Sequence, residues 1–95
     1  MLTRLMRRLP EAQDEALLND LLREAGDFIR AYTGRTEVPE ALESAQVQLA
    51  AVLYNRLGME GETRRAEGSV ERVAEAVPED LRRQLNPFRL ARGVN

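Results

Sequence analysis

The chain of 95 residues contains no cysteine and no histidine, and all fourteen of its basic residues are arginine. Without cysteine there is no disulfide bond, no thiolate nucleophile and no cysteine-based zinc site. Without histidine, neither a Ser–His–Asp triad nor imidazole metal ligation is available. These absences exclude many common catalytic and metal-binding chemistries from this chain.

Aromatic residues make up only 4 % of the chain, so its core must rest on leucine, valine and alanine. The longest apolar run, 49–54, is far shorter than the roughly 20 residues that a membrane span needs. The basic N-terminal stretch MLTRLMRRLP lacks the apolar segment of a signal peptide. With 43 % hydrophobic and 32 % charged residues, the chain is expected to be one soluble globular domain.

Carboxylates beside glycines give the best case for a metal or catalytic site. Glu60, Glu62 and Glu67 stand in such a stretch, but their spacing does not match a calcium-binding loop. The glycines also lack the Gly-Lys-Ser/Thr signature of a phosphate-binding loop. We therefore expect no enzyme activity, no metal and no cofactor.

The charge is unevenly distributed along the chain. Residues 1–10 carry three arginines and no acid, and residues 81–95 carry four arginines and no acid. All sixteen acidic residues lie in 11–80 with seven arginines, which gives this part a net charge of −9. The pattern indicates an acidic body with two basic ends, although an ordinary solvated surface explains it equally well.

A first long helix is predicted from Asp14 to Gly34. Apolar residues recur there at three- and four-residue steps, as on the buried face of an amphipathic helix. Asp14 is the expected N-cap and Gly34 the expected C-terminal stop. Gly26, inside this helix, costs about 1 kcal/mol relative to alanine. It either lets another helix approach closely or is simply tolerated.

A second long helix is predicted from Pro39 to Leu57. Proline at the first helical position needs no amide partner, and Glu40 meets the positive end of the helix. The helix is apolar on most sides, which indicates a central helix or one shared with a neighbouring subunit. Gly58 is expected to end it.

Shorter helices are predicted around these two. Residues 78–85 begin with the same Val-Pro-Glu chemistry, and Asn86-Pro87 should stop this third helix. The sequence therefore predicts a single all-α domain, a small helical bundle of two long helices plus one or two short ones. The predicted domain begins with a basic N-terminal segment at 1–10 that forms a short helix. A helical body follows at 11–86, and it contains a long loop at 58–69 and one or two helical turns at 69–77. An extended C-terminal arm is predicted at 87–95.

Several short motifs follow one another along the chain and together carry a resemblance. They are Tyr-Thr-Gly-Arg at 32–35, Val-Pro-Glu-Ala-Leu at 38–42, Leu-Tyr-Asn-Arg at 53–56, Gly-Met-Glu-Gly-Glu at 58–62, Gly-Ser at 68–69, Val-Pro-Glu-Asp at 77–80 and Leu-Asn-Pro-Phe-Arg at 85–89. In this order and spacing, from about Leu17 to Arg89, the chain resembles the head–tail connector (adaptor) proteins of long-tailed bacteriophages.

The resemblance implies a structural virion protein that is made in the host cytoplasm and lies at the head–tail junction. By it, copies of the protein assemble into a ring, usually dodecameric, beneath the portal. The ring extends the DNA channel and docks the tail. The implied partners are therefore other copies of the chain, the portal protein, and a tail-side completion or tail terminator protein. DNA would pass without specific binding, since an acidic channel wall does not retain it.

Candidate interface residues lie in the central stretch and in the tail. They are Tyr54, Asn55, Arg56, Glu60, Glu62, Arg64, Arg65, Phe88, Arg89, Leu90 and Arg92. The apolar residues at 88 and 90 stand two residues apart, which favours an extended arm that adds to a partner's surface. The alternatives are a terminus folded back onto the bundle and, for the tyrosines, ordinary core packing.

Two other functions remain open from the sequence. One is a small helical adaptor that binds a partner helix through the apolar residues of 42–57. The other is a DNA-binding module that uses the arginines of the two basic ends. The acidic body argues against the second, and so does the absence of aromatic residues among the arginines.

Overall fold

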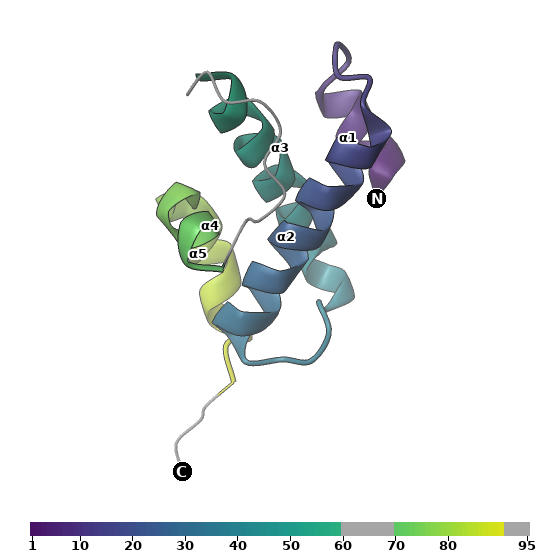
Figure 1. Ribbon diagram of the computed structural model, residues 1–95. Coiled ribbons are helices and arrows are strands. Elements are labelled where there is room, and N and C mark those ends of the chain that lie inside the picture. The colour runs from purple at the N-terminus through teal and green to yellow at the C-terminus, as the bar shows by residue number, and fades with distance from the viewer. Residues whose placement is uncertain (60–69, 91–95) are drawn as a thin grey trace.

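The computed structural model describes residues 1–59 and 70–90, and these form helices joined by short connections (Figure 1). The α-helices are α1 (Leu2–Arg8), α2 (Glu15–Thr33), α3 (Glu43–Met59), α4 (Val70–Ala76) and α5 (Glu79–Leu85), and two 3₁₀ turns are η1 (Glu40–Leu42) and η2 (Asn86–Phe88). No strand occurs within the described ranges. The predicted all-α class is confirmed.

Helix α2 has the two ends that the sequence predicts. The Asp14 carboxylate accepts a hydrogen bond of 3.1 Å from the Leu17 amide, which is the bond an N-cap supplies. Gly34 ends the helix in the left-handed region with φ 76°, and its amide donates to the Arg30 carbonyl at 2.9 Å. Only glycine adopts that conformation without strain, so this position fixes where α2 stops.

Helix α3 differs from its prediction at both ends. Pro39 is not the first helical residue, because the chain first makes the 3₁₀ turn η1 and Pro39 caps that turn. Gly58 does not end the helix either, since α3 continues through it to Met59. A glycine costs a helix only about 1 kcal/mol, and the preceding residue, Leu57, packs against the core and holds this last turn in place.

Helix α3 lies with α2 at the centre of the molecule, and each of the two contacts all of the other α-helices. The first half of α3 carries most of its buried residues: Ala45, Gln46, Val47, Leu49, Ala50 and Ala51. These lie on all sides of the helix, which explains why its apolar residues follow no narrow stripe. The prediction of a central helix agrees with these contacts.

Gly26 of α2 lies against a side chain of α3. The Gln46 side chain reaches across from α3 and donates a hydrogen bond of 2.8 Å from Nε2 to the Leu22 carbonyl. A Cβ atom at position 26 would lie 2.8 Å from that same Nε2, which is closer than real Cβ contacts. Gly26 is therefore the residue that lets the two helices approach, and the first of its two predicted roles applies.

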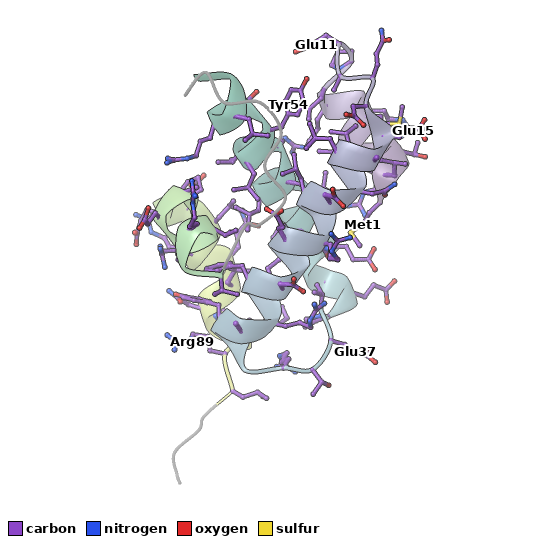
Figure 2. The ribbon with its side chains drawn as sticks, in the orientation of Figure 1. Met1, Glu11, Glu15, Glu37, Tyr54 and Arg89 are labelled. Carbon is purple, nitrogen blue, oxygen red and sulfur yellow. The ribbon has the colours of Figure 1, made fainter. Side chains whose placement is uncertain are left out.

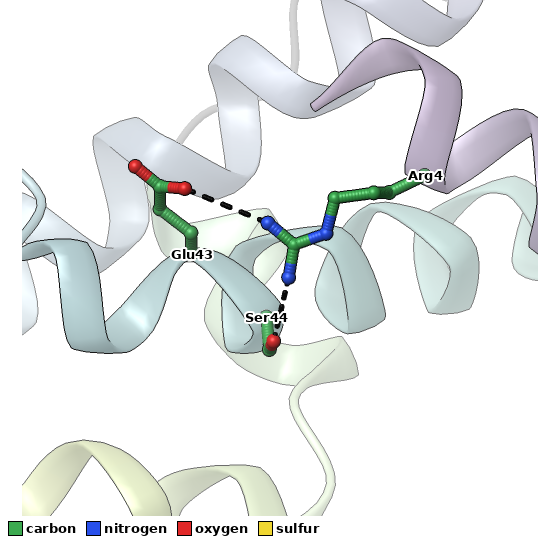
Figure 3. Close-up of polar contacts among 3 residues, drawn as sticks. All are labelled: Arg4, Glu43 and Ser44. Carbon is green, nitrogen blue, oxygen red and sulfur yellow. Dashed lines mark hydrogen bonds and ion pairs between the residues drawn. The ribbon is translucent and has the colours of Figure 1, made fainter.

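The short helix α1 covers one side of the α2–α3 pair. Leu5 is fully buried there, and Leu9 follows it into the core. Arg4 reaches α3, where its guanidinium bonds the Ser44 hydroxyl at 2.7 Å and the Glu43 carboxylate at 3.5 Å (Figure 3). The predicted basic helix at the N-terminus is thus part of the core, and one of its arginines binds the protein itself.

Helices α4 and α5 pack against the opposite side from α1 (Figure 1). Val73, Val77, Leu81 and Leu85 supply their buried residues. Arg82 of α5 donates a hydrogen bond of 2.7 Å to the Ala74 carbonyl near the end of α4. The same carbonyl also accepts a longer hydrogen bond of 3.4 Å from the Val77 amide, so Arg82 adds a second donor at the end of α4.

The predicted extended arm at 87–95 is wrong for its first residues. Helix α5 ends at Leu85, as predicted, but the chain then makes the 3₁₀ turn η2 instead of extending, and Phe88 is half-buried against the core. Burial of an aromatic ring outweighs the small cost of keeping this turn ordered. Residues 91–95 lie outside the described residues. In the described ranges, no helix has the length and apolarity of a membrane span.

The Gly26–Gln46 contact predicts non-additive mutational effects. Gly26→Ala in the wild-type chain should displace the buried Gln46 amide, and the lost bond costs about 1–3 kcal/mol. In a Gln46→Ala background that clash is gone, so Gly26→Ala should stabilise α2 by up to about 1 kcal/mol. Urea unfolding of the two single variants and the double variant measures the coupling energy. Additivity within about 0.3 kcal/mol would show that the two residues do not constrain each other.

Candidate assembly surfaces

The predicted interface residues do not form one surface. Figure 2 shows Tyr54 at one end of the body and Arg89 at the other, beside the C-terminal end of α2. Tyr54 is half-buried and packs against the core, whereas Asn55 and Arg56 are exposed. Tyr54 therefore takes part in core packing, and its role at an interface stays a prediction.

Five further candidates lie outside the described residues. They are Glu60, Glu62, Arg64, Arg65 and Arg92. Most of the predicted loop at 58–69 also lies outside the described residues. Its first two residues, Gly58 and Met59, are described and belong to α3. The interface role of these positions stays a prediction.

The end of the described chain is joined to the end of α2 through backbone groups. The Leu90 amide donates a hydrogen bond of 2.9 Å to the Thr33 carbonyl, one of the carbonyls that the end of a helix leaves unpaired. The Arg35 side chain donates from Nε to the Phe88 carbonyl at 2.8 Å. These two bonds lay the segment after α5 across the C-terminus of α2.

Tyr32 stands at the middle of the same junction. Its hydroxyl donates a hydrogen bond of 2.5 Å to the Asn86 side chain. Its ring stacks on Phe28 with ring centroids 5.4 Å apart, and the Arg89 guanidinium lies 4.7 Å from the ring centroid. Arg82 approaches the ring at 5.8 Å, so the tyrosine is held by stacking, by cation–π contacts and by a hydrogen bond.

Sequence reasoning missed this junction. The Tyr-Thr-Gly-Arg motif at 32–35 and the Leu-Asn-Pro-Phe-Arg motif at 85–89 were read as separate marks of a resemblance. The structure joins them, because the tyrosine and arginine of the first motif bond the asparagine and phenylalanine of the second. The only signal in the sequence was that polar residues of both motifs stand beside a predicted helix end, which does not identify a partner.

Two open grooves lie on the described surface. One, of about 480 Å³, is lined by residues 34–40 and Leu90, so the junction forms one of its walls. The other, of about 340 Å³, lies over α3 between α1 and α5, with Arg8 and Asp80 among its lining residues. Both grooves are lined largely by polar and charged side chains, which suits contact with another protein surface better than an apolar ligand.

Exposed charge gathers at separate places on the body. Arg7 and Arg8 are exposed at the end of α1, while Arg83 and Arg89 are exposed near the junction. Glu75, Glu79 and Asp80 are exposed where α4 passes into α5. Among residues 1–59 and 70–90, no three acidic side chains lie together in a way that would hold a metal ion. The surface is therefore suited to charge-complementary contacts with other macromolecules.

Comparison with known proteins agrees with the resemblance in the sequence. The model of the phage gp6-like head-tail connector protein family matches residues 3–89, nearly the whole chain. No curated protein and no solved structure matches this chain. The matched range includes α1 and both motifs of the junction, so it spans every helix described above. The chain belongs to the phage gp6-like head-tail connector protein family.

Proposed function

We propose that this protein is a structural component of a phage virion that forms a ring beneath the portal, extends the DNA channel and docks the tail. The observation that carries the proposal is the family match over residues 3–89. The proposed partners are further copies of the chain, the portal protein, and a tail-side completion or terminator protein. DNA would pass through the ring without specific binding.

The charge of the chain supports the channel role. The part from 11 to 80 carries a net charge of −9, and exposed acids occur on several of its elements, among them Glu11, Glu37 and Glu75. A wall of this sign repels the phosphate backbone, so DNA would slide along it without being retained.

Two surfaces at opposite ends of the body are proposed as contact sites. One is the C-terminal half of α3 with Tyr54, Asn55 and Arg56, as a contact between ring subunits; the same role is proposed for Glu60, Glu62, Arg64 and Arg65, which lie outside the described residues. The other is the junction end with Arg89 and Leu90, as a contact with acidic groups of the portal; the same role is proposed for Arg92, also outside the described residues. The separation of Tyr54 and Arg89 in Figure 2 supports two different partners. The half-buried position of Phe88 makes it a support for this second surface instead of its anchor.

The two alternative functions lose support from the fold. A partner helix would need the apolar residues of 42–57, but Leu42, Ala45 and Leu49 are already buried inside this chain. A DNA-binding module would use the arginines of the two basic ends, but Arg4 is bonded to α3 and Arg82 to α4, which leaves fewer of them for phosphate contacts. The connector role requires neither feature.

Ring formation is the first testable consequence. Purified protein mixed with its portal ring should add a layer of density below the portal in electron microscopy, compared with the portal alone. A variant with residues 60–67 replaced by a Gly/Ser linker should keep its helical circular dichroism and thermal unfolding, because the core described above comes from other residues. It should fail to add the layer. A portal that binds no wild-type protein under these conditions would contradict the proposed function.

The chain end provides a second prediction. Truncation after Leu90 removes residues 91–95 and keeps all the junction contacts described above, so the helical fold and its unfolding midpoint should be unchanged. Portal affinity should fall by at least about tenfold, since the truncation removes Arg92 and the other side chains that are proposed to contact the portal. Binding measured by co-sedimentation with portal rings tests this, with Arg23→Glu on the outer face of α2 as a charge-changing control. Unchanged affinity of the truncated protein would rule out a docking role for 91–95.

DNA binding provides a third prediction. Because the body is acidic, duplex DNA should bind the isolated protein only weakly at about 150 mM salt, with little retention in a gel-shift at micromolar protein. Micromolar affinity with a steep loss on raising the salt would instead support the DNA-binding module and contradict a passive channel wall.

A further inference from the structure

The contacts that hold residues 86–90 to α2 differ in kind from those of the core. Asn86, Pro87, Arg89 and Leu90 are all exposed, and only Phe88 is half-buried. Immediately before them, Leu85 is 1 % exposed and belongs to the core. The boundary between buried apolar packing and exposed polar contact therefore falls between residues 85 and 86.

Segments held mainly by exposed hydrogen bonds open more readily than segments held by buried apolar surface. Opening residues 86–90 breaks the bonds from Tyr32 to Asn86, from Arg35 to Phe88 and from Leu90 to Thr33. It uncovers little more apolar surface than the part of Phe88 that packs against the core and the surface beneath it. The fully buried apolar residues of the core all lie outside this segment.

We infer that residues 86–90 form a latch that opens independently of the helical body, with Tyr32 as the residue that fastens it. Tyr32 is suited to this role because its ring stays in place when the latch opens. The ring stacks on Phe28, which is 2 % exposed and lies within α2 itself. The hydroxyl is the part that engages Asn86, so ring and hydroxyl have separate functions.

Opening changes what this end of the molecule presents. The Arg35 and Arg89 side chains lose their partners on the latch and on Tyr32, and the backbone of 88–90 becomes available for hydrogen bonds. Leu90 also leaves the wall of the groove lined by residues 34–40. Arg82 stays with the body, because it bonds the Ala74 carbonyl. The inference concerns the free protein and does not depend on the proposed ring.

Amide hydrogen exchange followed by NMR tests the latch in the full-length protein. The Leu90 amide reports the latch through its bond to Thr33, and the Leu49 amide in the middle of α3 reports global unfolding. Leu90 should exchange more slowly than an unstructured amide but at least about a hundredfold faster than Leu49. Tyr32→Phe, which keeps the ring and removes the hydroxyl, should speed Leu90 exchange about fivefold. Gln84→Ala is the control, because the Gln84 side chain donates to Gln48 and not to the latch, and it should leave the Leu90 exchange rate unchanged.

A core variant separates latch opening from unfolding. Val47→Ala lies in α3 and destabilises the whole body, so it should speed exchange of Leu49 by about tenfold or more. The Leu90 rate should not change, because its exchange does not pass through global unfolding. Three results would overturn the inference: equal exchange rates for Leu90 and Leu49, a Leu90 amide as fast as in an unstructured peptide, or a Leu90 rate that Tyr32→Phe leaves unchanged.

Discussion

The close approach of α2 and α3 at Gly26 is the constraint on which the rest of the structure depends. With no side chain at this position, the Gln46 amide reaches the Leu22 carbonyl, and a buried polar group finds a partner in the core. The contact also fixes the register of the two helices, because sliding either one by a turn would place a Cβ atom where Gly26 leaves room for the Gln46 amide. The α2–α3 pair forms the surface on which the shorter helices pack.

The shorter helices are ordered by this pair and by local polar contacts. Each of α1, α4 and α5 has seven residues, too few for a helix to be stable alone in water. Burial of Leu5, Val73 and Leu81 against the α2–α3 pair supplies most of the stability that these short helices lack on their own. Arg4 and Arg82 then satisfy groups on neighbouring helices, so two arginines that seemed available for phosphate or acidic partners have structural roles.

The junction between α2 and residues 86–90 connects the fold to the proposed function. It lies at the opposite end of the body from Tyr54 (Figure 2) and sets where the chain leaves the helices. Its members come from motifs more than fifty residues apart, held together by one stacked tyrosine and two bonds that involve the backbone. Family membership indicates what kind of assembly this chain belongs to. The junction is the part of the chain that we infer to open and close.

Local chemistry was sufficient to predict much of the helical structure from the sequence. Asp14 and Gly34 fix the ends of α2 because a side-chain cap and a left-handed glycine act within a few residues of the chain. Gly58 did not end α3, because packing of the neighbouring Leu57 outweighs the modest cost of a helical glycine. Apolar periodicity likewise predicted helices but could not choose among their possible neighbours.

The sequence by itself therefore determined the all-α class, the approximate extents of the helices and, through its ordered motifs, the family. Only the tertiary structure decided that Gly26 faces Gln46, that Arg4 binds α3, and that Phe88 folds back while the Tyr32 hydroxyl donates to Asn86. The physical reason is range: capping and periodicity act between residues a few positions apart. A contact across twenty to fifty-four positions depends instead on how complete helices pack, and no local pattern in this chain records that.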